Sequence, residues 1–153
     1  MRILGEVRPT SLWLLALVGV LFFVPNVSAA TIQANSASAL NAAIKNARSG
    51  DVIQLANGNY GHVDITKHNY SGAGLVIRGG RGAVVSDVVF NASSFVTLSG
   101  MTLAPSGSTA NITIQVGSHN ITIDNIYANG VNENLGARVR ANESTSNITI
   151  QNS

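Results

Sequence analysis

The sequence predicts an all-β protein, a parallel β-helix (solenoid) that begins with a short N-terminal capping helix. Short runs of alternating apolar and polar residues recur along the chain, and several of these runs end in glycine or asparagine. From Thr31 onward, 12 Ile and 11 Val accompany 16 Asn, a composition typical of short strands joined by turns. A repeat of about 20 to 30 residues with several strands and no helix indicates coils that stack on one another.

Residues 1–30 have the features of a secretory signal peptide. Two arginines precede 13 uninterrupted apolar residues at 12–24, and Ala29 and Ala30 offer the small side chains that a signal peptidase requires. Because a membrane anchor needs about 20 apolar residues, we expect cleavage after Ala29 or Ala30 and no stable membrane anchor. The rest of the chain, 31–153, is then secreted or periplasmic, where polysaccharides are plentiful and nucleotide cofactors are scarce.

The charged and sulfur-containing residues exclude several classes of protein. Charged residues make up 10% of the chain, too few for a disordered tail or a coiled coil. Seven Lys and Arg oppose six Asp and Glu in 31–153, and this net charge of +1 gives no basis for a nucleic-acid partner. The chain has no cysteine, so a disulfide framework and a thiolate metal site are excluded.

The first element after the leader is a strand and capping helix within 31–50. A helix over 38–49 carries apolar residues at helical spacing, with Ser38 as its N-cap and Gly50 as its end. The apolar face consists of Leu40, Ala43, Ile44 and Ala47.

Beyond Gly50 the helical spacing stops, and 51–153 is predicted to form the coils. Four copies of one template occupy 75–79, 96–100, 121–125 and 148–152. Their central residues, Ile77, Leu98, Ile123 and Ile150, are separated by 21, 25 and 27 positions. The copies end in Gly79, Gly100, Asn125 and Asn152, residue types that tolerate a left-handed backbone. This recurrence fits a bend that preserves register better than the hairpins of a β-sandwich, the main alternative.

A second series of strands interleaves with the first and carries the candidate binding residues. Its members, at 88–90, 112–116 and 137–141, are offset by 24 and then 25 positions. Alternation turns Ile112, Ile114 and Val116 inward and Thr113 and Gln115 outward. The same offset turns Val139 inward, so Arg138 and Arg140 project outward.

The outward position that matches Gln115 and Arg140 one coil earlier is Asn91. We therefore predict that Arg138, Arg140, Gln115 and Asn91 form a binding surface for an acidic polysaccharide, because guanidinium groups match carboxylates in bidentate geometry. The alternative is that these are ordinary solvated strand residues.

Three stretches, at 40–44, 50–60 and 94–103, resemble the right-handed parallel β-helix proteins of the polysaccharide lyase kind, especially relatives of alginate lyase and chondroitinase B. The resemblance covers nearly all of 35–153 and implies a right-handed solenoid. It implies less about activity, since adhesins and epimerases carry the same cap and coils.

The resemblance also implies a chemistry that this chain does not fully supply. Eliminative cleavage of a uronate needs a base for the C5 proton and a cation for the carboxylate. In these lyases a Lys and an Arg do the acid–base work, and calcium often assists. Arg140 falls about where that Lys would be, but a guanidinium is a poor base. The later catalytic Arg would lie beyond Ser153, so no catalytic residue is predicted.

Other polar residues give weaker patterns. Oxygen ligands that calcium would accept occur at Asp124, Asn129, Asn132, Glu133 and Asn134, without a fixed ligand spacing. No metal site is therefore predicted, and calcium stays an implication of the resemblance. His62, His68 and His119 are expected at the surface or in turns, with His62 before a strand. Tyr60, Tyr70 and Tyr127 are expected to pack in the core or at edges, the alternative being stacking on sugar rings.

The last template copy stops at Ser153, where the earlier copies continue into another strand. We predict that the chain is the N-terminal part of a longer polysaccharide lyase-like protein, or that another chain covers this edge. The alternative is a non-catalytic carbohydrate-binding or surface-structural β-helix, and a third possibility is a remnant without activity of its own.

Overall fold

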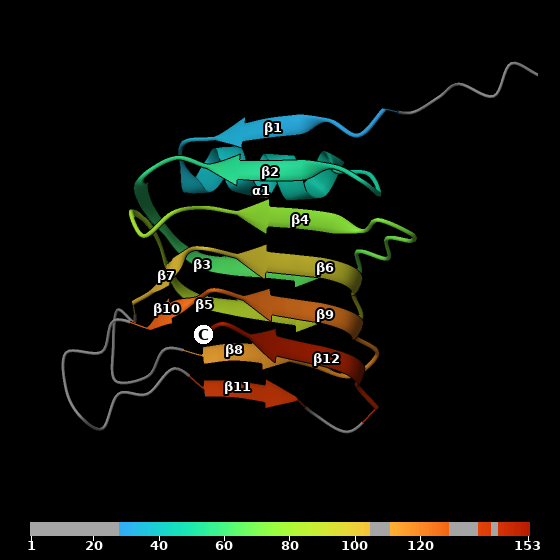
Figure 1. The fold of residues 1–153 in the computed structure, drawn as a ribbon. Coiled ribbons are helices and arrows are strands. Elements are labelled where there is room, and N and C mark those ends of the chain that lie inside the picture. Colours follow the sequence, from blue (N-terminus) through green and yellow to red (C-terminus); the bar gives the residue numbers. More distant parts are fainter. Residues whose placement is uncertain (1–27, 105–110, 129–137, 142–143) are drawn as a thin grey trace, which may run out of the picture.

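The computed structural model describes residues 28–104, 111–128, 138–141 and 144–153, with the backbone alone at 111 and 138–140. The chain forms a parallel β-solenoid of about 4 turns with one short helix (Figure 1). The predicted all-β solenoid with an N-terminal capping helix is confirmed, and its right-handedness stays a prediction. No helix within the described ranges is long and apolar enough to span a membrane. Most of the predicted leader, residues 1–27, lies outside the described residues.

Sheet A, which faces the viewer in Figure 1, contains one strand from each coil. In spatial order its strands are β1 (Thr31–Ala34), β2 (Val52–Leu55), β4 (Leu75–Arg78), β6 (Ser94–Ser99), β9 (His119–Asp124) and β12 (Ser146–Gln151). Every neighbouring pair is parallel, and Ile77, Leu98, Ile123 and Ile150 occupy one row across the sheet. The predicted template and its spacings are therefore confirmed, and Ile53 extends the row by one coil.

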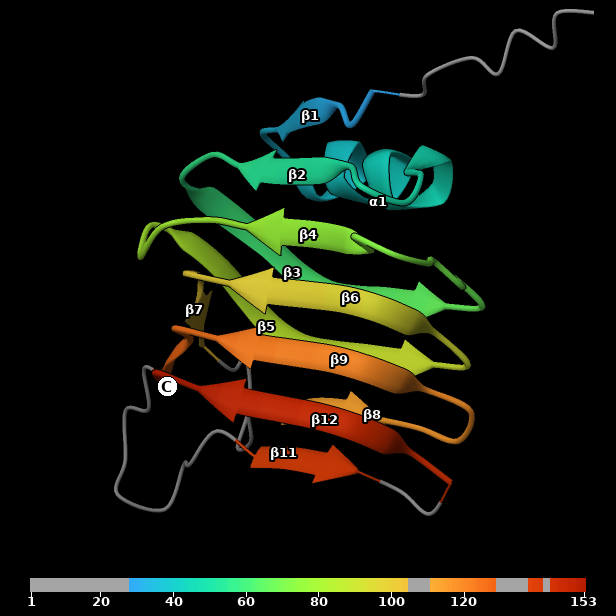
Figure 2. The ribbon, with the colours of Figure 1, turned by 45° about the vertical axis from the view of Figure 1, so that its right-hand side comes forward.

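Sheet B forms the opposite wall, and most of its strands cross the solenoid in the opposite direction to those of sheet A (Figure 2). Its strands are β3 (Gly58–Thr66), β5 (Ala83–Asn91), β7 (Thr102–Leu103), β8 (Asn111–Ile114), β10 (Tyr127–Ala128) and β11 (Arg138–Ala141). The long strand β5 pairs with β3 along its length. Its first half also pairs with β7, which continues to β10, and its second half pairs with β8, which continues to β11.

The register of sheet B corrects part of the second predicted series. The offset of 24 between β5 and β8 is confirmed by the pairing of Val88 with Ile112. The next offset is 27 rather than 25, because Arg138 pairs with Asn111 and Arg140 pairs with Thr113. In sheet A, paired residues of β9 and β12 are also 27 positions apart, so the last coil has the same number of residues measured on either sheet.

Val116 is a second correction on this strand, since it is 58% exposed instead of facing inward. Strand β8 ends at Ile114, and the chain then turns with Gly117 at a φ of +80°. The alternation that buries Ile112 and Ile114 therefore does not reach Val116.

The capping helix α1 (Ala37–Asn46) covers the N-terminal end of the core, behind β1 and β2 in Figure 1. Leu40, Ala43 and Ile44 are buried as predicted, and Ala47 is partly buried against them. The N-cap is Ser36 rather than Ser38, because the extended backbone at Ser36 lets its hydroxyl accept a hydrogen bond from the amide of Ala39 at 3.2 Å.

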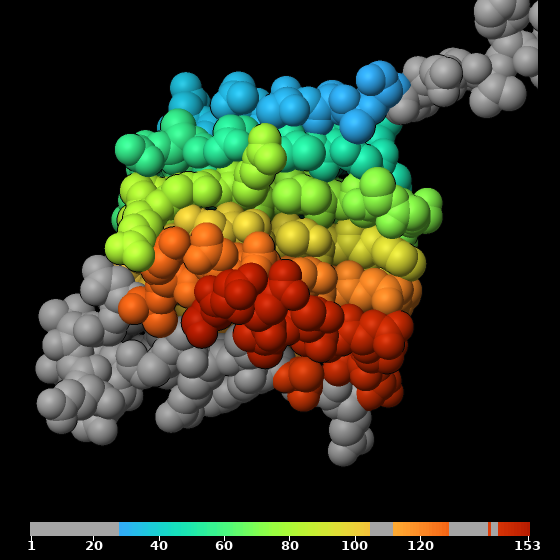
Figure 3. All heavy atoms as spheres, viewed as in Figure 1, coloured from blue at the N-terminus to red at the C-terminus, as the bar shows by residue number. Residues whose placement is uncertain are grey.

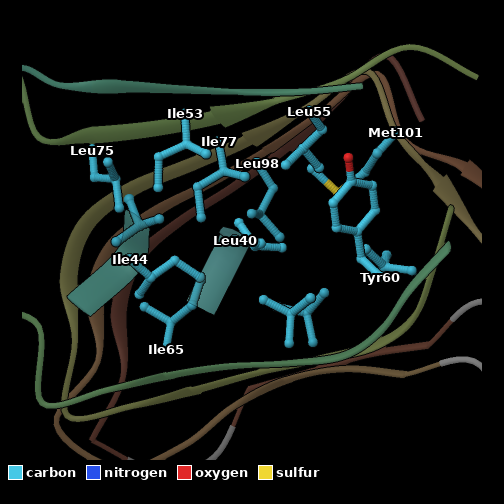
Figure 4. Packing of buried hydrophobic residues seen from close by; sticks show 14 of the residues in the cluster. Leu40, Ile44, Ile53, Leu55, Tyr60, Ile65, Leu75, Ile77, Leu98 and Met101 are labelled. Carbon is cyan, nitrogen blue, oxygen red and sulfur yellow. The ribbon is translucent and has the colours of Figure 1, made fainter. Parts of the chain in front are cut away.

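The core fills the space between the two sheets, as Figure 4 shows along the solenoid. Rows of aliphatic side chains from sheet A meet Ile65 and Tyr60 of β3, and Leu40 and Ile44 of α1 close one end. Such continuous stacking of like side chains buries apolar surface without hairpins between neighbouring strands. At the last coil Ile150 is 53% exposed.

The predicted left-handed turns occur at three of the four template ends. Gly100, Asn125 and Asn152 have φ values of +74°, +50° and +52°. Gly79 does not have a positive φ, so the prediction is wrong there. A Cβ atom at Gly79 would lie 2.7 Å from the Cβ of Ala83, so the small size of this glycine is what the corner needs.

Candidate functional site

The predicted site lies in sheet B, in three rows of register positions that neighbouring coils bring side by side. We call this surface the sheet B face, and its rows follow the strand pairing. The first row is His62, Asp87, Asn111 and Arg138; the second is Asp64, Val89, Thr113 and Arg140; the third is Thr66, Asn91 and Gln115.

Asn91 and Gln115 lie side by side in the third row, as predicted. Both residues are half-buried. The main-chain amide of Gln115 donates a hydrogen bond to the main-chain carbonyl of Phe90 at 2.8 Å, which keeps Gln115 against β5. Arg140 does not share their row; it lies one row away, at the register position of Thr113. The side chains of Arg138 and Arg140 lie outside the described residues, so their outward direction stays a prediction.

The structure adds a histidine–carboxylate pair to the sheet B face. Nδ1 of His62 lies 2.5 Å from Oδ2 of Asp87, with the two side chains 55% and 34% exposed. His62 lies inside β3 rather than before a strand, which corrects its predicted location. The hydroxyl of Thr66 donates a hydrogen bond to Asp64, so the carboxylates on β3 and β5 both have partners.

The charges on the sheet B face are unevenly distributed. Asp64 and Asp87 belong to the coils nearer the N-terminus, whereas Arg138 and Arg140 belong to β11, the outermost strand of the sheet. A polyanion would therefore meet carboxylates at one end of this face and arginine positions at the other.

A second candidate site, which the sequence did not indicate, is a groove on sheet A with a volume of about 330 Å³. It lies on the face shown in Figure 3. Thr97, Thr122 and Thr149 form one row of its lining. Phe95, Asn120 and Asn147 form the neighbouring row, where Nδ2 of Asn147 donates a hydrogen bond to Oδ1 of Asn120 at 2.9 Å.

Phe95 is the unusual residue of this groove. The residues at its position in four successive coils, Gly74, Phe95, Asn120 and Asn147, all have a left-handed backbone, with φ values of +67°, +56°, +55° and +53°. Glycine and asparagine adopt this conformation at low cost, but phenylalanine does not. Its ring packs partly against the core and meets His119 edge-on, with 5.8 Å between ring centroids. A strained aromatic residue in an open groove is a candidate ligand platform.

The three tyrosines and the two other histidines lie at different depths in the fold. Tyr60 and Tyr70 are buried, which confirms core packing, and burial raises the pKa of both hydroxyls. Tyr127 is half-exposed under the guanidinium of Arg81, which lies 4.1 Å from the ring centroid. His68 is half-buried beside Tyr70, and His119 is the first residue of β9 rather than part of a turn.

Of the possible calcium ligands, Asp124 lies within the described residues and the other four, Asn129, Asn132, Glu133 and Asn134, lie outside them. Hydrogen bonds from Asn152, Gln151 and Ser99 lower the pKa of Asp124. These protein donors already occupy its oxygens. Among the side chains that the structure describes, no three histidines or carboxylates come together as a metal site would require.

Comparison of the chain with protein-family models, with curated proteins and with solved structures returned no match. The parallel β-solenoid therefore rests on the strand register, and the resemblance to polysaccharide lyases stays a prediction.

Proposed function

We propose that the protein is a secreted or periplasmic β-solenoid that binds an acidic polysaccharide along the sheet B face. The observation that supports this best is the neighbouring placement of Asn91, Gln115 and the Arg140 position across three adjacent strands. Strands in a sheet are about 4.8 Å apart, so these positions follow one another along the solenoid, with Arg140 one row away from Asn91 and Gln115. A polysaccharide is itself a regular chain, and donors on successive strands suit it.

Charge favours the end of this face that carries β11. Guanidinium groups at Arg138 and Arg140 would pair with uronate carboxylates, whereas Asp64 and Asp87 would repel them. We therefore place the acidic chain over β8 and β11, with Gln115 and Asn91 as neutral donors beside it.

Geometry supports binding better than turnover on the described part of this face. His62 carries the described imidazole on this face, a kind of group that often serves as a general base, and its Nε2 atom is not the one that contacts Asp87. Arg138 lies in the same row but three strands away, about 14 Å at the usual strand spacing. Proton abstraction requires hydrogen-bond reach, about 3 Å, so these two residues do not serve one sugar unit. A lyase activity would need groups beyond the described residues.

The test compares a double variant, Arg138→Ala with Arg140→Ala, with a control that removes the same charge elsewhere, Lys45→Ala with Arg78→Ala. Binding to alginate is measured by calorimetry at low and high salt, and circular dichroism checks the fold. We expect the first variant to bind at least tenfold more weakly and to lose most of the salt dependence, and the control to bind normally. Equal affinity of wild type and the first variant would remove this face from the proposal. A rise in ultraviolet absorbance from unsaturated sugar ends would instead show turnover.

A non-catalytic carbohydrate-binding module is the second candidate function, and the sheet A groove favours it. Within the described residues the hydroxyls of Thr97, Thr122 and Thr149 have no protein partner. The ring of Phe95, whose backbone is left-handed, lies beside them. Charged residues are absent from its described lining, which suits a neutral sugar chain. Phe95→Asn removes the ring while keeping a residue that tolerates the left-handed backbone. We expect it to abolish binding of cello-oligosaccharides while circular dichroism shows that the fold is retained; unchanged binding would refute this candidate.

The exposure of Ile150 on β12 supports the proposal that further coils or another chain contact this edge. Strands β11 and β12 are the outermost strands of their sheets, and Ile150 is 53% exposed. The proposal is tested by reading the coding sequence beyond Ser153 and by measuring the intact mass of the secreted product. Additional coils or a stable dimer would support it, and a soluble monomer with the mass of 30–153 or 31–153 would contradict it.

A further inference from the structure

Asp51 is a buried carboxylate whose two oxygens both accept hydrogen bonds from the main chain. The residue is 6% exposed and precedes β2. Its Oδ2 accepts from the amide of Arg48 at 2.8 Å, closing the turn that follows α1. Its Oδ1 accepts from the amide of Ala30 at 2.9 Å, 21 positions earlier in the chain. Asp51 thus joins the end of the helix to the segment that precedes β1.

Both main-chain polar groups of Ala30 are hydrogen-bonded. While its amide donates to Asp51, its carbonyl accepts a hydrogen bond from the amide of Val52 at 2.8 Å, one position before the ladder of β1 and β2 begins. Ser28 and Ala29 are exposed, so the fold does not depend on burying the residues before Ala30.

The small residues before β1 allow cleavage after Ala29 or after Ala30, and the structure distinguishes the two. Cleavage after Ala30 would remove the donor to Asp51 and the acceptor for Val52 together. Cleavage after Ala29 would keep both bonds. It would also turn the Ala30 amide into a charged group beside a buried carboxylate, which needs a cation more than a neutral donor.

We propose that a signal peptidase hydrolyses the bond between Ala29 and Ala30, and that the new α-ammonium of Ala30 forms an ion pair with Asp51 that locks β1 onto the solenoid. Water adds across the amide, which leaves a carboxylate on Ala29 and the ammonium on Ala30. Removal of the leader is thereby coupled to completion of the N-terminal coil. This inference rests on the predicted leader and is independent of polysaccharide binding.

The ion pair has a predictable pH dependence. Backbone hydrogen bonds from Ala30 and Arg48 already lower the pKa of Asp51, so this carboxyl is ionised at neutral pH. The charged neighbours are the Arg48 guanidinium, which opposes the ammonium, and Tyr70, whose pKa the carboxylate helps to raise and which is neutral here. An α-amino group normally has a pKa of about 7.7 to 8.0, and the carboxylate raises it. The resulting stability is therefore present below about pH 8 and is lost as pH rises through the raised value.

The first experiment expresses the full chain with its own leader in a secreting host and determines the N-terminus of the product by intact mass and terminal sequencing. We expect Ala30 as the first residue. A product that begins at Thr31, or one that retains the leader, would overturn the proposal, whether or not it binds polysaccharide.

The second experiment measures the reactivity of the α-amine of that product with an acylating reagent between pH 6 and pH 10. We expect acylation at pH 6.5 to be about tenfold slower than for an unpaired α-amine, which corresponds to a pKa raised by about one unit. Asp51→Asn should restore ordinary reactivity, while the matched control Asp64→Asn, an exposed carboxylate, should not. Ordinary reactivity in the wild type would overturn the ion pair even if Asp51→Asn is not secreted.

Discussion

Nδ1 of His62 lies 2.5 Å from Oδ2 of Asp87, a contact between two residues 25 positions apart that the pairing of β3 with β5 brings together. Both side chains remain in contact with water, at 55% and 34% exposure. The pair occupies the end of the sheet B face farthest from β11, where His62 contacts one of the two carboxylates that would repel an acidic ligand.

Because the pair is exposed, we expect it to contribute little to stability. Ion pairs in this setting are worth about 0 to 1 kcal/mol. Asp87→Asn should therefore lower the free energy of unfolding by less than about 1 kcal/mol, measured by urea denaturation at pH 6. Asp64→Asn is the matched control on β3. A loss above about 2 kcal/mol for Asp87→Asn alone would show that this contact supports the sheet.

Gly100 should be sensitive to substitution, whereas Gly58 should not. Gly100 has a φ of +74°, and a Cβ atom there would lie 2.6 Å from the carbonyl oxygen of Gly79. Gly58 has no heavy atom within 4 Å of the same position. We expect Gly100→Ala to lower the unfolding free energy by about 1 to 3 kcal/mol and Gly58→Ala to change it by less than about 0.5 kcal/mol. Equal effects in thermal denaturation would contradict the turn geometry.

The Tyr60 hydroxyl joins the first two coils, and its burial predicts a loss of stability at high pH. It donates to the carbonyl oxygens of Ala34 or Ala56, at 2.8 and 2.9 Å. Ala34 keeps another donor, the amide of Ala56, so Tyr60→Phe should cost about 1 kcal/mol at pH 7.

Burial raises the pKa of Tyr60, so the folded state holds this proton more tightly than the unfolded state. Stability should then be unchanged below the ordinary value of about 10 and fall as pH rises beyond it. In melting curves from pH 8 to pH 11, Tyr60→Phe should reduce this fall, with the remainder due to Tyr70, whose pKa burial also raises. An identical alkaline slope in wild type and variant would contradict the prediction.

Two residues of one row should respond differently to truncation. Leu98 is 1% exposed in the middle of the stack, whereas Ile150 is 53% exposed on β12. Leu98→Ala should lower the unfolding free energy by about 2 to 5 kcal/mol, because it leaves a cavity between coils. Ile150→Ala should cost less than half as much in the same urea titration. A comparable loss at Ile150 would mean that this side chain is covered in solution.

The register of sheet A could be predicted because Ile77, Leu98, Ile123 and Ile150 stand in nearly identical surroundings in the sequence. The register of β11 could not be predicted in the same way. Val139 is the single branched apolar residue of that strand, and a shift of two positions leaves it on the same face. The predicted face was therefore compatible with either offset, while the predicted neighbour of Arg140 was wrong.

The candidate sites were harder to predict because they depend on irregular backbone. The register of β3 with β5 shifts around Gly61, which hid the approach of His62 to Asp87. The left-handed position at Phe95 is marked by asparagine in the two following coils, but an aromatic residue gives no such signal. A leader was expected from the apolar run at 12–24 and the small residues after it, whereas the proposed choice of the bond between Ala29 and Ala30 rests on the hydrogen bond to Asp51.

The coils of this solenoid differ in length while their ladder stays in register. Successive members of the central row, from Ile53 to Ile150, are 24, 21, 25 and 27 positions apart. The corners absorb these differences, and doubling a flexible corner costs only about 0.6 kcal/mol in closure entropy. The scaffold can thus gain or lose surface loops during evolution without repacking its interior. Grafting a loop at a corner offers an engineer the same freedom to change what the solenoid recognises.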